Sequence, residues 1–276
     1  MSGSTSRDDA HHQAATVPAL ALIEFRHVRK AFGRKVVYED LNLDIHRGES
    51  LTIIGGSGMG KSVMLKMLIG LLPVDAGSIR FDGTEVLGLA EGKLSAVRRR
   101  IGMLFQGSAL FDSLSVRENV AYGLREHLHM SESQIGERVA ESLHVVGLPG
   151  IEQMWPADLS GGMKKRVGLA RAIAVKPEVL LYDEPTTGLD PINTTRINRL
   201  ILDLKRTLEV TSVVVTHDMH SAYAVSDRLA MIHQGHVIFA GTPEEIRESG
   251  NPNVRDFIEG NAPDEDDPET LLRYGG

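Results

Sequence analysis

The chain has 276 residues, 42% of them hydrophobic, and a formal net charge of −7. A chain of this length can bury one large core, or one core with a smaller attached subdomain. The absence of cysteine excludes disulfides, thiolate metal sites and a cysteine nucleophile. The acidic balance argues against nucleic acid as a partner, because phosphate backbones bind basic faces.

The sequence carries no evident targeting or membrane signal. Residues 1–19 are small and polar, lack the apolar core of a signal peptide, and are expected to form a disordered tail. No apolar run reaches the roughly 18 residues that a membrane-spanning helix needs. We therefore expect the chain to remain in the cytoplasm and to reach any membrane through a partner.

Strand-like stretches open the ordered part of the chain. Residues 20–32 alternate like a strand, and Val36–Ile45 follow before a turn. After the turn, short apolar runs alternate with helical periodicity, the pattern of an α/β fold with a parallel sheet. The runs are Leu51–Gly55, Ile101–Gln106, Val179–Asp183 and Ser212–His217. Each ends at the strand edge where ligands bind in open α/β sheets.

The remaining segments are predicted to be helical or to form a hairpin. Ser62–Leu72 has helical periodicity, and residues 107–176 lack strand character, which predicts a helical insert. A hairpin is expected around Gln234-Gly235. A helical piece follows Glu244, and residues 246–276 form a C-terminal extension with an acidic tail.

A glycine-rich loop follows the first of the apolar runs. It consists of Gly55, Gly56, Ser57, Gly58, Met59, Gly60, Lys61 and Ser62, and it fits G-x-x-x-x-G-K-[ST]. Its glycines let successive backbone N–H groups point at phosphate oxygens, at the positive end of a helix dipole. Lys61 would reach the β- and γ-phosphates, and Ser62 would ligate Mg²⁺. The loop predicts nucleoside triphosphate binding, which GTPases, kinases and ATPases share.

Two carboxylates end a later apolar run. Asp183 follows four apolar residues, a position that suits a Mg²⁺ held jointly with Ser62. Glu184 comes one residue later, where it can take a proton from an attacking water. Together with the phosphate loop, this pair predicts an enzyme that hydrolyses the triphosphate.

A third motif, Leu159–Met163 with the sequence LSGGM, narrows the family. Phe32, the phosphate loop, Gln106, LSGGM, Asp183-Glu184, Thr187–Asp190 and His217 follow one another over residues of about 20–245. This order and spacing resembles the ATP-binding subunits of ABC transporters. The resemblance implies a P-loop NTPase fold with a RecA-like core sheet, an antiparallel β subdomain and a helical signature subdomain at about 107–176.

The resemblance also implies roles around one ATP. Phe32 would stack on the adenine, and Gln106 would contact Mg²⁺ and the water beside Ser62 and Asp183. Lys61, Gln106, Glu184 and His217 would form the catalytic set, with His217 holding the attacking water in line.

Other roles implied by the resemblance join two copies of the chain. Ser160, Gly161 and Gly162 would face the γ-phosphate of an ATP bound by a second copy. Asp190 would lie in the loop that crosses the dimer interface. Two half-sites would then make each active site.

Finer features point to a subfamily. LSGGMKKRVGLARAIA has a methionine and two lysines where most family members carry glutamines, and it is similar to the ATPases of Mla/Mce-type lipid transporters. That similarity implies a membrane permease, an Mce-domain lipid-binding protein and a small STAS-domain protein as partners. It places the chain at the cytoplasmic face of a bacterial inner membrane. Met163 puts a ribose contact at that position in doubt.

Rival functions remain open at this level. One is an ABC importer or exporter for another substrate, and another is a soluble ABC ATPase that acts on ribosomes or DNA. Soluble members usually carry two ATPase cores or a long coiled-coil insertion, and neither pattern is seen here. A non-hydrolysing regulatory binder is disfavoured, because Glu184, His217 and Gln106 are all present.

Two surface features were assigned from composition. The basic triplets Arg98–Arg100 and Lys164–Arg166 are expected to be solvated faces. Two interpretations remain for four apolar residues after Gln106, a groove that receives a permease helix or a helical core. These residues are Phe111, Leu114, Val116 and Tyr122.

Overall fold

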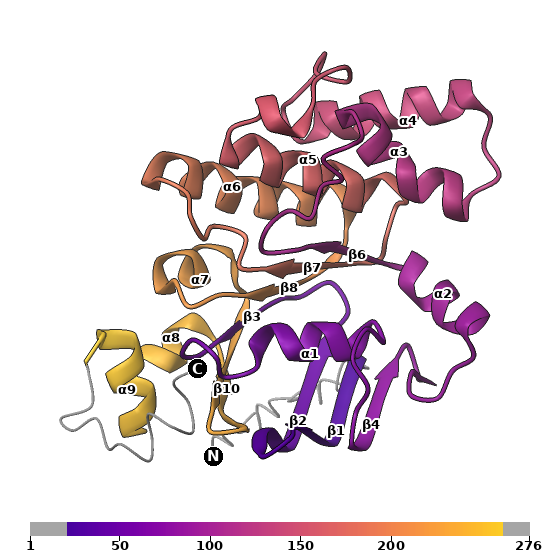
Figure 1. The fold of residues 1–276 in the computed structure, drawn as a ribbon. Helices are drawn as coiled ribbons and strands as arrows, with labels where there is room; N and C mark the ends of the chain where they lie inside the picture. Colours follow the sequence, from indigo (N-terminus) through magenta and orange to yellow (C-terminus); the bar gives the residue numbers. More distant parts are fainter. Residues whose placement is uncertain (1–20, 262–276) are drawn as a thin grey trace, which may run out of the picture.

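The computed structural model describes residues 21–261, so the predicted N-terminal tail and the acidic tail after Asn261 lie outside the described residues. Within that range, two β-sheets lie beside a layer of helices (Figure 1). This arrangement confirms the predicted α/β fold with a separate antiparallel sheet and a helical subdomain.

The smaller sheet is antiparallel and comes mostly from the start of the chain. Its order is β2-β1-β4-β5, from β1 (Ala21–Phe32), β2 (Lys35–His46), β4 (Ala76–Phe81) and β5 (Thr84–Glu85). Ile23 and Phe25 are fully buried and pair across β4 with Phe81 and Ile79. This alternation explains why β1 was predicted, whereas the short strands β4 and β5 were not.

The larger sheet has the order β10-β9-β3-β8-β7-β6. Its strands are β3 (Ser50–Ile54), β6 (Ile101–Leu104), β7 (Val179–Asp183), β8 (Thr211–Val215), β9 (Arg228–His233) and β10 (His236–Gly241). The first five are parallel, and β10 runs antiparallel to β9. Strands β3, β6, β7 and β8 are buried along their length, as unbroken apolar runs predict. Gln234 and Gly235 both have positive φ and form the predicted hairpin turn.

Helices flank the parallel strands. They are α1 (Lys61–Leu68), α2 (Glu91–Arg99), α6 (Pro191–Leu208), α7 (Met219–Val225), α8 (Pro243–Arg247) and α9 (Pro252–Glu259). Helix α1 ends earlier than the periodicity of Ser62–Leu72 predicts. Gly70 takes a left-handed conformation, with φ 65°, and turns the chain out of the helix. Helix α2 was not predicted.

The segment between Gly107 and Lys176 is helical, as predicted. It contains α3 (Val116–His127), α4 (Glu132–Val145), the 3₁₀ turn η1 (Pro156–Asp158) and α5 (Gly161–Ala174). Ser115, Ser131 and Ser160 each cap the N-terminus of a helix with their hydroxyl groups. The buried residues of these helices share one core with Leu180 and Tyr182 of β7, so the helical layer is packed onto the sheet.

The parallel strands all end at one edge of the molecule. The N-termini of α1, α5 and α6 lie at the same edge, on the left of Figure 1. This edge therefore gathers helix N-termini and strand ends, the parts that bind phosphate in α/β proteins. Among residues 21–261, none of the helices combines the length and apolar character needed to cross a membrane.

Candidate nucleotide site

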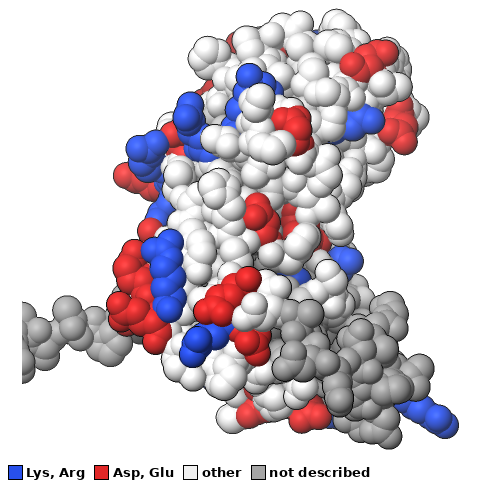
Figure 2. All heavy atoms as spheres, turned by 90° about the vertical axis from the view of Figure 1, so that its left-hand side faces the viewer, with Lys and Arg blue, Asp and Glu red and all other residues white. Residues whose placement is uncertain are grey.

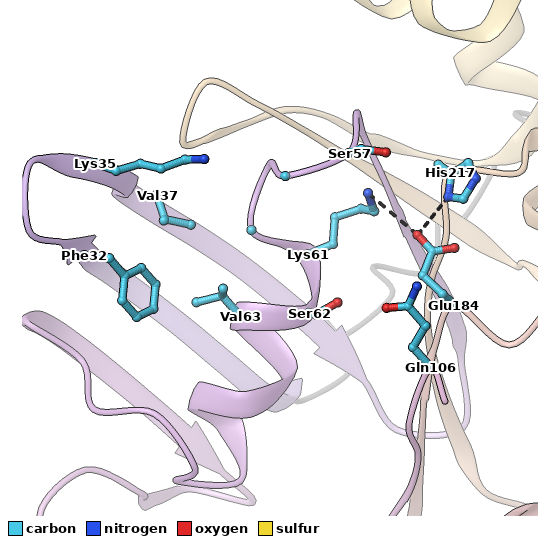
Figure 3. Close-up of a pocket in the computed structure, with 12 residues that line it drawn as sticks. Phe32, Lys35, Val37, Ser57, Lys61, Ser62, Val63, Gln106, Glu184 and His217 are labelled. Carbon is cyan, nitrogen blue, oxygen red and sulfur yellow. Dashed lines mark hydrogen bonds and ion pairs between the residues drawn. The ribbon is translucent and has the colours of Figure 1, made fainter. Parts of the chain in front are cut away.

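A pocket of about 400 Å³ opens at this edge. Its lining comes from the β1–β2 turn, the phosphate loop and the ends of three parallel strands (Figure 3). The lining residues are Phe32, Lys35, Val37, Ser57, Gly58, Gly60, Lys61, Ser62, Val63, Gln106, Glu184 and His217. The structure thus brings together nine of the residues predicted from the sequence, which range from Phe32 to His217.

The phosphate loop depends on its glycines at two crowded positions. Gly55 has φ 151°, and a Cβ there would lie 2.5 Å from the carbonyl oxygen of Ile232. Gly60 has φ 91°, and a Cβ there would lie 2.3 Å from a methyl group of Val37. The hydroxyl of Tyr38 donates to the carbonyl of Gly60 at 2.7 Å. The loop is therefore held against both sheets in a conformation that other residues would strain.

Lys61 is buried inside the curve of the loop. Its ammonium donates to the carbonyls of Gly55 and Gly56 at 2.9 and 3.0 Å. It also lies 3.9 Å from the carboxylate of Glu184. Burial lowers the pKa of Lys61, and the nearby carboxylates of Glu184 and Asp183 oppose that shift. A bound triphosphate would give this ammonium the counter-charge that carbonyl groups supply only in part.

Ser62 and Asp183 form the oxygen pair that the sequence predicted. The hydroxyl of Ser62 donates to Asp183 Oδ1 at 2.5 Å, and the aspartate is 3% exposed. Gln106 lines the same pocket. A hydroxyl, a carboxylate and an amide oxygen are all hard donors, the set that Mg²⁺ prefers when it also keeps waters and phosphate ligands. The donor set fits the predicted metal.

Glu184 is held by both its backbone and its carboxylate. Its φ is 48°, in the left-handed region, and its N–H donates to the carbonyl of Val215 at 2.9 Å. His217 Nδ1 lies 3.0 Å from one carboxylate oxygen, and the hydroxyl of Thr187 donates to the other at 3.0 Å. Figure 3 shows the carboxylate between Lys61 and His217. A left-handed glutamate at a buried strand end indicates a functional constraint on its position.

The remaining predicted residues do not line this pocket. Ser160 caps α5 by accepting from the N–H of Met163 at 3.3 Å, and Asp190 caps α6 by accepting from Ile192 and Asn193 at 3.0 Å. A Cβ on Gly162 would lie 3.2 Å from the side chain of Asn193. LSGGM and the Asp190 loop are thus neighbours on the same edge but outside the pocket of their own chain.

Some pocket residues were missed from the sequence. Lys35 and Val37 lie two positions apart on β2, so they share a face that points into the pocket. Val63 follows Ser62 at the start of α1 and completes the lining beside Phe32. The two-residue period of β2 was the only signal that could have indicated the first two.

The expectation that both basic triplets are solvated faces is wrong for several of their residues. Lys165 is buried, not solvated, and its ammonium donates to the backbone carbonyls of Gln106 and Glu184. Arg98 donates to the carbonyl of Ile69 at 2.8 Å. Arg100 pairs with Glu178 at 2.6 Å. A run of lysines and arginines in the sequence does not indicate which of their side chains are buried.

A second, more apolar groove of about 610 Å³ lies beside the segment that follows Gln106. Phe111 and Tyr122 line it, are 43% and 45% exposed, and have ring centroids 4.9 Å apart. Val116 instead belongs to the helical core, and Leu114 does not line the groove. Val116 thus fits the interpretation as helical core, Phe111 and Tyr122 line a groove, and Leu114 belongs to neither the groove lining nor the helical core.

Figure 2 shows the face that carries the strand ends. On its described surface, lysine and arginine groups are interspersed with aspartate and glutamate groups rather than gathered in a continuous basic field. This charge pattern matches the mixed composition of the sequence.

Comparisons with known proteins agree on one family. Residues 38–187 match the ABC transporter family. The chain is 41% identical to the intermembrane phospholipid transport system ATP-binding protein MlaF of Haemophilus influenzae, over 87% of this chain and 90% of the relative. It is 42% identical to a probable ribonucleotide transport ATP-binding protein of Mycobacterium leprae, over 88% of this chain and 70% of that protein.

Solved structures give the same result. A dimeric ATP-binding cassette in a post-hydrolysis state bound to ADP and Pi matches with a TM-score of 0.74 and 32% identity, over 80% of this chain and 98% of that one. A second match is the structure of cbiO1 from Clostridium perfringens, described as part of the ABC transporter complex cbiONQ. It has a TM-score of 0.76 and 29% identity, over 83% of this chain and 91% of that one.

Proposed function

The chain belongs to the ABC transporter family and is an ATPase subunit of it, and from this premise we propose that it drives a membrane permease that moves phospholipid or a related lipid. The observation that carries the lipid class is the 41% identity to a phospholipid transport ATP-binding protein over 90% of that protein's length. The variant signature LSGGMKK supports it. We assign residues 20–245 to the ATPase domain.

Hydrolysis would begin when the triphosphate replaces the carbonyl contacts of Lys61. Phe32, 45% exposed at the far end of the pocket, would stack on the adenine. Mg²⁺, held through Ser62, Asp183 and Gln106, would supply positive charge to the β- and γ-phosphates.

Glu184 and His217 would then act on the attacking water. The Glu184 carboxylate accepts the water proton while the water oxygen bonds to the γ-phosphorus and ADP leaves with the electrons of the broken bond. His217, 3.0 Å from that carboxylate, orients the water and the γ-phosphate. The contacts from His217 and Thr187 hold the carboxylate in the pocket before ATP arrives.

A second copy of the chain would complete each site. Ser160, Gly161 and Gly162 lie at the N-terminus of α5, on the same edge of the molecule as the pocket but outside the pocket of their own chain. A helix N-terminus is suited to bind a γ-phosphate presented from elsewhere. The dimeric state of the matched cassette supports this arrangement. ATP would hold two copies together, with the Asp190 loops between them.

The permease would bind in the groove beside Gln106. Phe111 and Tyr122 give it an exposed aromatic wall, and the groove continues to the segment that carries Gln106. Closure of the ATPase pair would therefore move the permease. We propose a position at the cytoplasmic face of the bacterial inner membrane, with an Mce-domain lipid-binding protein and a small STAS-domain protein as further partners.

The test is purification of this protein from membranes in mild detergent, with mass spectrometry of the proteins and lipids that accompany it. A permease with an Mce-domain protein and phospholipid is expected. Phe111→Glu should lose the permease, whereas Trp155→Glu, an aromatic residue 49% exposed outside the groove, should retain it. Ribosomes or DNA in place of membrane proteins would overturn the transporter assignment.

A second substrate class is supported by the mycobacterial relative, whose name refers to ribonucleotide transport. Its identity, 42%, is as high as that of the phospholipid relative. The chain spans 66–70% of the length of the mycobacterial relatives, so they contain additional sequence. Recovery of a permease without lipid, together with nucleotide-stimulated ATPase activity of the complex, would favour this alternative.

A further inference from the structure

A buried ammonium group lies behind the nucleotide pocket, outside its lining. Lys165 is 5% exposed and comes from the second turn of α5, the helix that Ser160 caps. Its Nζ donates to the backbone carbonyl of Gln106 and, at 3.1 Å, to that of Glu184. One side chain thus joins the signature helix to the two strand ends that carry the predicted water-binding residues.

The two contacts hold segments with unusual backbone conformations. Glu184 has φ 48°, and Ser108 and Ala109, just after Gln106, have φ 64° and 46°. The guanidinium of Arg171, two turns further along α5, donates to the carbonyls of Ser108 and Ala109. Left-handed conformations persist in such residues only when surrounding contacts stabilise them. Helix α5 supplies these contacts as two cations aimed at carbonyl oxygens.

The surroundings of Lys165 offset part of the cost of burying its charge. Burial lowers its pKa, and the carboxylates of Asp183 and Glu184 oppose that shift. The two backbone carbonyls accept from the ammonium, which has three N–H donors, and the carboxylates of Asp183 and Glu184 add coulombic attraction. A buried lysine with such partners has a defined position, unlike a solvated lysine of the same helix.

We propose that Lys165 is a positioning residue for ATP hydrolysis, which fixes the backbones of Gln106 and Glu184 relative to each other and to α5. The side chain of Glu184 reaches the pocket because its carbonyl is held on the opposite side. Loss of the ammonium allows the carboxylate to move away from the attacking water. Nucleotide binding is unaffected, because Lys165 does not line the pocket.

The absence of cysteine permits a direct chemical test. Lys165→Cys introduces a single thiol, which is alkylated in urea before refolding. Bromoethylamine gives a side chain with the length and charge of lysine, and bromopropane gives a neutral one of the same shape. The wild-type chain, carried through the same steps, is the control for refolding. Lys164→Met, at the half-buried neighbour on α5, is the control for loss of a lysine from this helix.

The expected result is a loss of turnover without loss of binding. The propyl form should have kcat about 10-fold or more below the aminoethyl form, since small displacements of a catalytic group are costly. KM, nucleotide affinity and Tm should be similar in the two forms. Amide hydrogen exchange at residues 106–109 should be faster in the propyl form. Lys164→Met should behave as wild type.

The inference rests on the proposed role of Glu184, so Glu184→Gln is measured alongside. Normal turnover in Glu184→Gln would overturn the role of Glu184 itself. An inactive Glu184→Gln with equal kcat in the propyl and aminoethyl forms would overturn only the role of Lys165. Because both alkylated forms come from one Lys165→Cys preparation and are refolded in the same way, a difference in kcat at equal Tm and equal nucleotide affinity reports the charge and not the fold.

Discussion

The phosphate loop and the signature helix both place a buried lysine beside Glu184, but they differ in how the lysine is held. Lys61 follows the loop whose Gly55 and Gly56 carbonyls it contacts, so its partners are five and six residues away. Lys165 contacts Gln106 and Glu184, which are 59 and 19 residues away. A site built from local contacts can be read from a motif, whereas one built from distant contacts requires the fold.

The largest expected effect on turnover is that of replacing Glu184, which both Lys61 and Lys165 contact. Glu184→Gln should lower kcat by roughly 10²-fold or more, because the amide cannot accept the water proton. ATP binding should persist, since Lys61 and Ser62 are unchanged. ATPase assays with labelled-nucleotide binding check this. Glu209→Gln is a matched control, because Glu209 also has a left-handed backbone, at the end of α6, but is exposed and does not line the pocket.

Next in size is a change at the signature helix. Gly162→Glu should reduce hydrolysis by roughly 10²-fold, because it places a carboxylate where a γ-phosphate from the second copy would bind. Single-chain nucleotide affinity should change little, as Gly162 does not line the pocket. Gly136→Glu, on α4, is the control for a glutamate in place of a helical glycine. Equal loss of nucleotide affinity and turnover in Gly162→Glu would place the signature in the pocket of its own chain.

The same contrast, between local contacts and contacts distant in the sequence, decides which features of the fold and site could be predicted. The phosphate loop, the parallel strands and the Asp183-Glu184 pair were identified because glycine spacing and apolar runs are local signals. The sequence did not predict strands β4 and β5 or helix α2, because such short elements show only weak periodicity of apolar residues. Lys165 was misassigned as solvated because its burial is set by α5 packing across Gln106 and Glu184. The sequence also did not distinguish Val116, which is buried in the helical layer, from Phe111, which lines the groove, because packing of the helices decides which of the two is buried.

The stability of the helical layer provides a third comparison. Leu124 of α3 is fully buried in the core shared with β7, so Leu124→Ala should destabilise the protein by about 2–5 kcal/mol. Chemical denaturation followed by circular dichroism measures this. Ile192→Ala, at a residue 66% exposed, should change the free energy of unfolding by less than about 0.5 kcal/mol. A small effect at Leu124 would show that the helical layer unfolds separately from the sheets.

The smallest effect involves an ion cluster far from the pocket. Arg100 and Arg47 both contact Glu178, and Arg100 also stacks over the ring of Phe81 with its guanidinium 4.6 Å from the ring centroid. The hydrogen bond from Arg100, and to a lesser extent that from Arg47, holds the pKa of Glu178 below its ordinary value.

A carboxyl whose folded-state pKa is lowered stabilises the protein above its unfolded-state pKa, and this contribution is lost as the pH falls through the folded-state value. The cluster should therefore strengthen folding at neutral pH and cease to do so in acid. Arg100→Met should lower the free energy of unfolding by at most about 1 kcal/mol at pH 7, since the group is partly exposed. The difference from wild type should shrink as the pH approaches 3. Arg99→Met, at the exposed neighbour, should show no such pH dependence. A constant difference across pH would mean that Arg100 stabilises the fold through its packing on Phe81, and that the ion pairs contribute little.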